Sequence, residues 1–427
     1  MARELEAQGP IQDVISYERL YRLWEANNWS ATEIDLSVDK DHWENKLDDT
    51  QRISAFWNYA MFLVGEEAVA RTLTPLLDAA PGFPQSIFLT TQIVDEARHH
   101  VFFDRFMREV VGEGEDTAST LEAMRPHLNW GFTSIFAELD SVTDALRKKP
   151  KDRELMAQTV ALYHFVIESL LAIPGQHFIK EYCERFDILP GFATGVRHIS
   201  RDESRHVAFG VKFLGELISS SRDARAAAIE VWDKTLPMAM GVFVPPNRDK
   251  KYVECFDFTI EEVMAFGLRS FEMKLGRIGV DPDEVALLSR EDRTRSYEDR
   301  AARGWTLVEA GVLGDDNREP TLDPHVLEIL FEGMSRSVDL ETARSLGGPI
   351  EWRFTDIEPW HLVVTNGHIE AKPGRAGSPA LALEVESGEF AKIAVGRSDA
   401  RWALLTRKLK VHGPLGAKAK LPKLFLQ

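Results

Sequence analysis

Residues 95–99 read Asp-Glu-Ala-Arg-His, and residues 202–206 read Asp-Glu-Ser-Arg-His. Each stretch is a Glu-x-x-His motif inside a long segment with helical periodicity, and residues three apart lie on one face of a helix. A single motif of this kind arises easily by chance. Two motifs that share the preceding Asp and the internal Arg predict one site built from two helices.

A lone acid precedes each motif, on a separate predicted helix. Glu66 and Glu67 follow an apolar stretch, and Glu168 stands inside the apolar run Phe165–Leu171. An unpaired charge in such a run is costly, and a bound metal ion removes that cost. Four-helix carboxylate proteins hold two metals with a Glu-x-x-His on each of two helices and a single Glu on each of the others. The pattern therefore predicts a dinuclear metal site.

The predicted ligand set contains four carboxylates and two imidazoles. Its members are Glu66, Glu96, His99, Glu168, Glu203 and His206. Helical spacing does not separate Glu66 from Glu67, because apolar residues lie three and four positions away from both. Hard oxygen ligands with imidazoles favour iron or manganese over zinc or copper.

An acid directly precedes the ligand Glu of each motif. A metal-bound His usually donates its second N–H to a carboxylate, so Asp95 and Asp202 are each expected to accept from the His of the opposite helix. The alternative is an ordinary salt bridge to Arg98, Arg201 or Arg205. Three further histidines, at positions 100, 164 and 177, are interpreted as core or surface residues, with the alternative that His164, one turn before Glu168, approaches the site.

Composition and pattern divide the chain into three parts. Residues 1–280 have helical periodicity, and the third metal helix is expected to bend at Pro174. Residues 281–321 are charged and broken, and are interpreted as a connector that packs partly on the helical part. Residues 322–427 show strand-like alternation, including a predicted strand at Ile393 and Val395 and an Asn366-Gly367 hairpin turn. The expected fold is mainly α, a ferritin-like helical bundle with a smaller α+β domain.

Charge and cysteine usage limit the setting of the protein. A net charge of −17 argues against nucleic acid as a partner. The two cysteines, Cys183 and Cys255, show no pairing pattern, which is typical of a reducing compartment. The N-terminus has no apolar signal region, and no run is interpreted as an integral membrane segment. A cytoplasmic protein is expected.

The motif set resembles the small subunit of class I ribonucleotide reductase over roughly residues 15–275. It is more similar to the related ligand-binding oxidases with a manganese–iron site. In those oxidases a Val three residues after the first ligand Glu is cross-linked to a Tyr five residues before the third-helix Glu. Val69 and Tyr163 match these positions, so the resemblance selects Glu66 as the ligand. In an α-helix Tyr163 would lie about 140° around the helix from Glu168.

One position departs from the reductases. Their radical Tyr lies four residues after the first-motif His, where this chain has Phe103. No reductase docking tail is recognisable at the C-terminus. A radical-storing subunit is therefore disfavoured. Four aromatic side chains near the motifs are candidates for the walls of a ligand tunnel, and the alternative is that they are plain core residues: Phe102, Phe103, Phe165 and Phe209.

The C-terminal part resembles the sterol carrier protein type-two family. The likeness rests on Trp352–Asp356, Trp360–Gly367 and Gly396–Asp399. The resemblance implies an apolar tunnel for fatty acyl chains or other lipids. The alternative is a dimerisation or stabilising module with a filled core.

Together the two resemblances imply an O₂-activating oxidase that acts on a hydrophobic, fatty-acid-like molecule. Its cofactor would be two metal ions, Mn/Fe or Fe/Fe, and the chain would form a homodimer and take electrons from a donor that the sequence does not identify. Two other functions are weighed against it. One is a ribonucleotide reductase small subunit, and the other is a non-enzymatic metal or lipid carrier.

Overall fold

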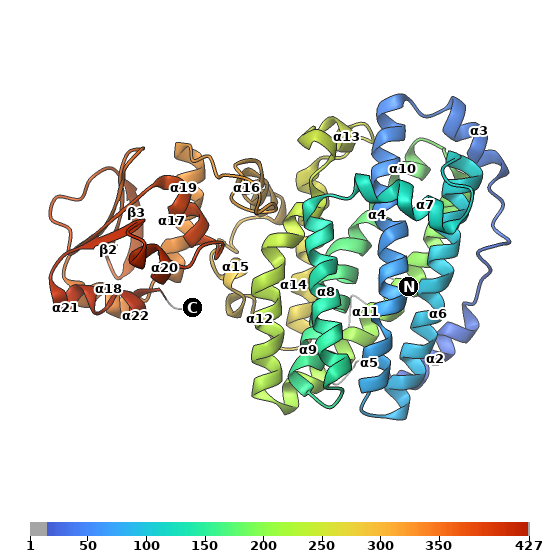
Figure 1. The fold of residues 1–427 in the computed structure, drawn as a ribbon, viewed down its shortest axis with the longest axis horizontal. Coiled ribbons are helices and arrows are strands. Elements are labelled where there is room, and N and C mark those ends of the chain that lie inside the picture. The colour runs from blue at the N-terminus through green and yellow to red at the C-terminus, as the bar shows by residue number, and fades with distance from the viewer. Residues whose placement is uncertain (1–14, 426–427) are drawn as a thin grey trace. The chain divides into compact units, whose positions relative to one another are not determined.

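The computed structural model describes residues 15–425. The extreme N-terminus, for which no apolar signal region is expected, lies outside this range. The contacts divide the chain into two compact units, with the boundary between Asp281 and Pro282. The first unit runs from blue to yellow in Figure 1 and the second from yellow-brown to red.

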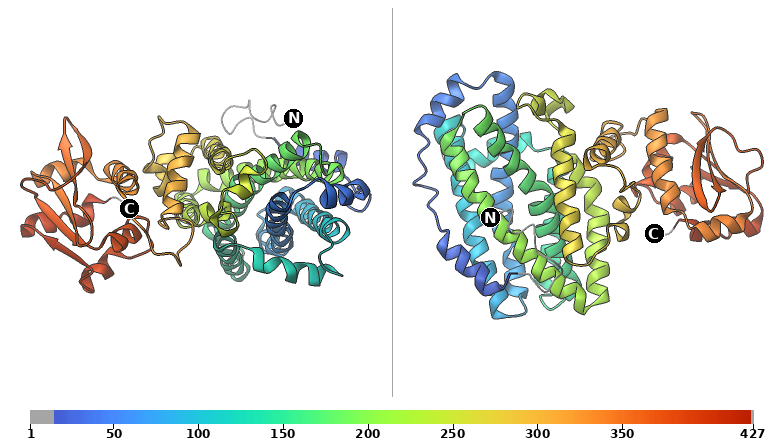
Figure 2. Two further views of the ribbon diagram at one scale, coloured as in Figure 1. Left: turned by 90° about the horizontal axis from the view of Figure 1, so that it is seen from above. Right: turned by 180° about the vertical axis from the view of Figure 1, so that it is seen from behind.

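The first unit is a bundle of long helices that run side by side (Figures 1 and 2). Its main helices are α2 (Tyr17–Ala26), α3 (Ser37–Asn45), α4 (Asp49–Thr72), α5 (Thr74–Ala79), α6 (Phe83–Phe106), α7 (Thr117–Met124), α8 (Trp130–Lys148), α9 (Arg153–Val160), α10 (Ile173–Arg185), α11 (Pro190–Ser220), α12 (Arg222–Ala239), α13 (Lys251–Glu254) and α14 (Ile260–Arg277). Two π-helical segments continue neighbouring helices: η2 (Met107–Val111) after α6, and η4 (Ala161–Ala172) between α9 and α10.

Side-chain caps fix where the metal-bearing helices begin. Asp48 forms a capping box with Gln51 at the start of α4. The start of α11 is capped from another helix, because the Asp39 carboxylate of α3 accepts the backbone N–H groups of Gly191 (2.9 Å) and Phe192 (2.6 Å). Asp39 is fully buried. The registers of α4 and α11 are therefore anchored at their N-termini.

The third metal-bearing helix is not a regular α-helix. Its central segment η4 is π-helical, and π-helical hydrogen bonds join residues five apart. Pro174, the second residue after the end of η4, has no N–H to offer the carbonyl of Leu170. Tyr163 and Glu168 are five residues apart, so they lie one turn from each other on one side of the helix. The predicted angle of about 140° between them is wrong, because it assumed α-helical geometry.

The same helix, Arg153–Arg185, is long and apolar enough to cross a membrane by length and composition. From the sequence, no run of residues was interpreted as a membrane segment. Within the structure, 78% of its most apolar window is buried. Such burial on all sides is typical of a helix at the centre of a bundle.

The second unit contains a five-stranded sheet in the order β3-β2-β1-β4-β5. The strands are β1 (Ile350–Phe354), β2 (Trp360–Thr365), β3 (His368–Pro373), β4 (Leu381–Val385) and β5 (Leu409–His412). Its helices are α15 (Ala286–Ser289), α16 (Tyr297–Glu309), α17 (Pro324–Ser337), α18 (Leu340–Leu346), α19 (Ser387–Ala394), α20 (Ala400–Leu405), α21 (Leu415–Lys418) and α22 (Leu421–Leu424). β1 pairs with β2 in antiparallel and with β4 in parallel orientation.

Local sequence patterns predicted some strands of this sheet and missed others. The β2–β3 hairpin turns at Asn366 and Gly367, both with positive φ, as the Asn-Gly signal indicates. The predicted strand at Ile393 is wrong. That residue belongs to helix α19, whose Phe390 and Ala391 are buried. The edge strand β5 had not been predicted.

The expected connector is grouped with the second unit. Trp305 and Val308 of α16 are buried. Arg397 donates from Nη1 to the carbonyl of Gly311 at 2.7 Å, and Arg303 pairs with Glu332 at 2.5 Å. These bonds tie residues 282–321 to the sheet domain, and the expected partial packing on the helical part stays a prediction.

Candidate metal centre

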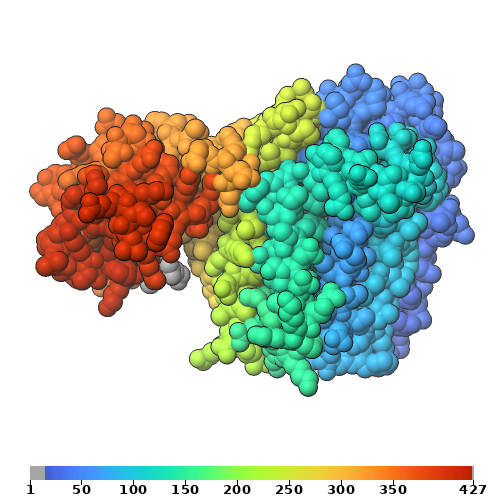
Figure 3. Space-filling view, in the orientation of Figure 1, coloured from blue at the N-terminus to red at the C-terminus, as the bar shows by residue number. Residues whose placement is uncertain are grey.

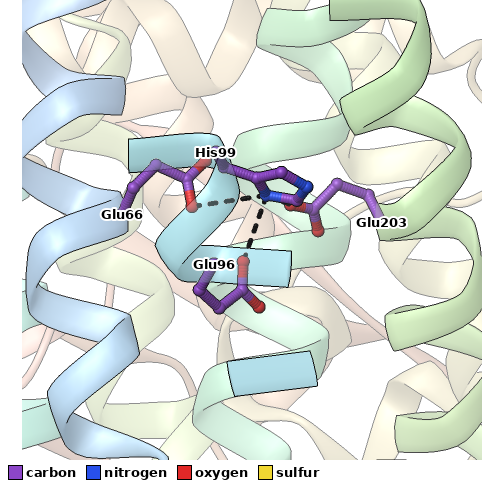
Figure 4. Close-up of side chains that lie close together, drawn as sticks. All are labelled: Glu66, Glu96, His99 and Glu203. Atoms are coloured by element: carbon purple, nitrogen blue, oxygen red, sulfur yellow. Dashed lines mark ion pairs between the residues drawn. The ribbon is translucent and has the colours of Figure 1, made fainter. Parts of the chain in front are cut away.

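The structure brings the six predicted ligands together at the centre of the bundle. Glu66 comes from α4, Glu168 from η4, and the two motifs come from α6 and α11. All six are buried. Their ligand atoms form two groups that share one carboxylate: Glu66, Glu96, His99 and Glu203, and then Glu96, Glu168 and His206. Figure 4 shows the first group converging from three helices.

The spacing within each group fits a cation at its centre. His99 Nδ1 lies 3.2 Å from Glu96 Oε2 and 3.6 Å from Glu66 Oε2. His206 Nδ1 lies 3.3 Å from Glu96 Oε1 and 3.5 Å from Glu168 Oε1.

Several buried atoms of the two groups lack a hydrogen-bond partner: Nδ1 of His99 and His206, Oε2 of Glu168 and Oε2 of Glu203. Buried polar atoms are almost always satisfied, and a metal ion in each group would satisfy these atoms, so the cluster is suited to a metal centre.

Each motif Asp lies against the imidazole of the opposite helix. Asp202 Oδ2 is 3.2 Å from His99 Nε2, and Asp95 Oδ2 is 3.1 Å from His206 Nε2. Arg205 bridges both acids, at 2.9 Å from Asp95 and 2.8 Å from Asp202. This arrangement turns Nδ1 of each His toward the carboxylates and holds the ring in place.

Two tryptophans from the N-terminal segment complete these contacts, and the sequence analysis missed them. Trp24 Nε1 donates to Asp95 Oδ1 at 2.9 Å, and Trp29 Nε1 donates to Asp202 Oδ2 at 2.7 Å. The segment before α3 thus covers the outer side of both motifs. No local pattern around either Trp indicates this role, because the contacts join residues 71 and 173 positions apart.

The structure separates the two adjacent acids of α4. Glu66 faces the first group, while Glu67 turns outward and pairs with Arg71 at 2.9 Å. The Glu67 side chain is 27% exposed, against 7% for Glu66. Only Glu66 is therefore placed to bind a metal.

Burial and mutual repulsion control the protonation of the cluster. Burial raises the pKa of Glu66 to about 8 and the pKa of Glu168 well above its usual range. Burial also opposes ionisation of Glu96, but the adjacent His206 and His99 prevail and lower its pKa to about 2. The two imidazoles are likewise opposed by burial, yet the surrounding carboxylates raise their pKa. Without a metal ion, protons held by Glu66, Glu168 and the two imidazoles offset the negative charge of the other carboxylates.

Gln92 is a site residue that the sequence analysis missed. Its Nε2 donates to Glu168 Oε1 at 2.7 Å and lies 3.3 Å from Glu96 Oε1. Its Oε1 lies 3.3 Å from His164 Nε2. His164 is fully buried, and it fits because residue 210 is glycine: a Cβ there would lie 2.2 Å from the Cβ of His164. The available signal was its position, four residues before Glu96 and so on the same face of the helix.

Replacement of Gln92 by Leu is expected to weaken metal binding at the second group about 10–100-fold, the effect usual for a residue that orients a ligand. Glu168 would lose its only short donor. Titration of metal-free protein with Mn²⁺ or Fe²⁺ under anaerobic conditions measures the affinity. The matched control is Gln176→Leu, another buried Gln, whose Nε2 has no partner. Equal loss in both variants would contradict a positioning role.

An apolar cavity adjoins the two groups. It is lined by Glu66, Glu96, Glu168 and Glu203 of the two groups, and by residues of α4 between Ser54 and Val69. Val69 and Tyr163 both line it. The Tyr163 hydroxyl donates to Glu96 Oε1 at 2.7 Å, so the phenol faces the candidate metal centre.

The expected wall residues have a different role. Phe102, Phe103, Phe165 and Phe209 are fully buried core residues that do not line this cavity. Other aromatic residues line it instead, including Phe62, Phe132, Phe136, Phe178, Tyr182 and Phe256. The four candidates are thus core residues, which was the alternative, and the walls come from α4, α8, η4, α10 and the segment 242–263.

Comparison with known proteins gives two family matches. Residues 10–237 match the model of the ribonucleotide reductase small chain, and residues 328–426 match that of the SCP-2 sterol transfer family. Among solved structures, the chain is similar to the R2-like ligand-binding oxidase from Sulfolobus acidocaldarius, with 27% identity and a TM-score of 0.51. That match covers 63% of this chain and 93% of the other.

A second solved structure is an R2-like ligand-binding oxidase with an aerobically reconstituted Mn/Fe cofactor. It has 21% identity and a TM-score of 0.54, and the match covers 61% of this chain and 92% of the other. At that identity the likeness shows the fold alone. With the family matches, it confirms the predicted fold class, a ferritin-like bundle with a smaller domain of sheet and helices.

Proposed function

Because the chain belongs to the ribonucleotide reductase small-chain family, we propose that it is a metal-dependent oxidase of the ligand-binding kind, which uses O₂ to oxidise a hydrophobic, fatty-acid-like molecule. One observation carries the proposal: the carboxylates of the candidate metal centre line an otherwise largely apolar cavity. A subunit that only stored metal or a radical would have no need of such a cavity.

The donor set suits manganese or iron in both groups. Glu66, His99 and Glu203 would hold one ion, Glu168 and His206 the other, and Glu96 would lie between them. When bound, the two ions supply the redox chemistry that reduces O₂ and removes hydrogen from a C–H bond. The protein excludes water from this chemistry, since all six ligands are buried. An external electron donor supplies the electrons that the substrate does not.

The lining of the cavity supports an acyl ligand with its carboxylate at the metals. None of the described side chains that line it is basic, so a ligand carboxylate has no other cationic partner there. From Ser54 to Glu66 the cavity follows α4 for about 18 Å at 1.5 Å per residue. That length suits an extended alkyl chain.

The reaction can be tested with protein loaded anaerobically with Mn²⁺ and Fe²⁺ and then exposed to O₂. The oxidase proposal predicts O₂ uptake and an oxidised acyl compound in the organic extract, identified by mass spectrometry. A stable tyrosyl radical in the electron paramagnetic resonance spectrum would instead support the reductase function. Metal binding well above two ions per chain, without O₂-dependent product, would support storage.

We further propose that Val69 and Tyr163 become cross-linked. One C–O bond forms, one C–H and one O–H bond break, and two electrons and two protons pass to O₂. The positions of both residues on the cavity wall and the hydrogen bond from Tyr163 to Glu96 support this reaction.

Tyr163→Phe is expected to abolish the cross-link completely, because the attacking oxygen is removed. Peptide mapping by mass spectrometry after aerobic metal loading measures the joined peptides. Tyr182→Phe is the matched control, since Tyr182 lines the same cavity but bonds to Tyr59. Joined peptides that persist in Tyr163→Phe, or that are absent from the native protein, would refute the assignment.

The C-terminal region that matches the sterol transfer family gives the oxidase a second lipid-related unit on the same chain. We propose that it binds acyl ligands and raises their effective concentration near the first unit, as tethering does in general.

A further inference from the structure

A small surface on the second unit combines exposed apolar and basic side chains. It is formed by helix α20 and the turn after it, and consists of Arg401, Trp402, Leu405, Arg407 and Lys408, here called the α20 patch. Trp402 is 64% exposed and Leu405 is 76% exposed. Ala403, between them in sequence, is fully buried. The helix thus packs through its smallest side chain and leaves its largest ones outside.

Exposed large hydrophobic side chains are concentrated in this part of the described chain. Of ten large hydrophobic residues that are exposed, four lie between positions 402 and 415. Single exposed hydrophobic residues need no explanation, but a cluster marks an interaction surface. The C-terminal part of the chain, red in Figure 3, forms much of the visible face of the second unit.

The charge of this region is opposite to that of the whole protein. Residues 400–425 contain seven Lys and Arg and no Asp or Glu, in a chain with a net charge of −17. Two acids lie close to the patch. Asp399 caps α20 by accepting the N–H groups of Arg401 and Trp402, and Glu389, only 10% exposed, pairs with Lys408 at 3.1 Å. The cationic groups of the patch therefore face solvent while the nearest acids are held by the fold.

We propose that the α20 patch docks the second unit on an anionic lipid surface. Trp and Leu side chains enter the boundary between headgroups and acyl chains, and neighbouring Lys and Arg side chains bind anionic headgroups. A protein partner would need a larger apolar area to form a stable interface. The combination of an exposed Trp, an exposed Leu and three basic residues, on an otherwise acidic protein, fits a charged membrane surface better.

Docking of this kind gives the second unit direct access to membrane acyl chains, and its reversibility follows from the small number of inserted side chains. The inference goes beyond the proposed oxidase function, and its failure would leave that function untouched.

Flotation of the full-length protein with lipid vesicles tests the proposal. Vesicles of phosphatidylcholine alone are compared with vesicles that also contain phosphatidylglycerol. We expect binding to the anionic vesicles only, weakened by added salt because screening reduces the attraction. Two variants remove the two parts of the patch: W402S/L405S and R401E/R407E/K408E. Each is expected to lower the bound fraction at least about 10-fold.

Matched controls lie on the first unit. R147E/K148E/K149E reverses three exposed charges near the end of α8 and changes the net charge equally, and I53S/F83S removes two exposed apolar side chains. Both controls should bind as the native protein does. Three results would overturn the proposal: no binding to anionic vesicles, equal binding to neutral vesicles, or equal loss in the controls. A shift from dimer to monomer in light scattering of W402S/L405S would also overturn it and identify the patch as a contact between chains.

Discussion

The Glu168→Ala protein is expected to lose the metal ion of the second group, and so to retain about one ion per chain where the native protein holds two. Glu168 is one of the three ligand residues grouped there, and its carboxylate is the one held by Gln92. Alanine leaves His206 with two carboxylates that the first group also uses, Glu96 and Glu203, whose Oε2 lies 3.6 Å from His206 Nδ1. Without a carboxylate of its own, the second group should not hold a divalent ion tightly. Elemental analysis of desalted protein after loading with excess metal measures the stoichiometry.

The control for this experiment is Glu67→Ala. Glu67 is adjacent to a predicted ligand in sequence, carries the same charge, and faces solvent beside Arg71. It should retain both ions, whereas Glu66→Ala should not. Equal loss in Glu67→Ala and Glu66→Ala would show that the choice between these two acids is wrong.

Removal of metal is expected to destabilise the first unit, and more so at higher pH. Burial raises the pKa of Glu66 from its ordinary value of 4.5 to about 8. A raised folded-state pKa contributes stability below pH 4.5 that is lost as pH rises toward 8. The pKa values of His99 and His206 are raised too, so their contribution also falls at higher pH. The metal-free protein should therefore lose stability between about pH 5 and 8.

Metal binding has the opposite pH dependence, because the ligands must be deprotonated to bind. At free metal about 1,000 times above its Kd, binding stabilises by about 4 kcal/mol. For a unit of this size that raises Tm by roughly 8–16 °C. Scanning calorimetry of loaded and chelator-treated protein at pH 5.5 and 8 measures the difference, which should widen at pH 8. Identical Tm values at pH 8 would contradict a metal-stabilised cluster.

The ligand pattern could be read from sequence because it is local. Each Glu-x-x-His motif lies within one helical turn, and Glu168 is conspicuous as an acid in an apolar run. The pairing of Asp95 with His206 and of Asp202 with His99 could also be predicted, because it follows once the two motifs face each other. Helical spacing alone did not separate Glu66 from Glu67; the resemblance and then the structure did.

What the sequence did not reveal depends on contacts between distant segments. Trp24 and Trp29 reach the motifs from the N-terminal segment, and the cavity walls come from helices that carry no motif. The π-helical geometry of η4 was missed because nothing in residues 161–172 distinguishes it from an α-helix. The strand expected at Ile393 was wrong because a short apolar alternation also fits a helix with one buried face.

Two metal ions are expected to occupy the six-residue cluster that lines the apolar cavity. Anomalous X-ray diffraction from crystals of protein loaded with both Mn²⁺ and Fe²⁺, collected at the two absorption edges, locates them. We expect two anomalous peaks on either side of Glu96, one between Glu66, His99 and Glu203 and the other beside Glu168 and His206. A single peak, or peaks that do not touch these residues, would contradict it.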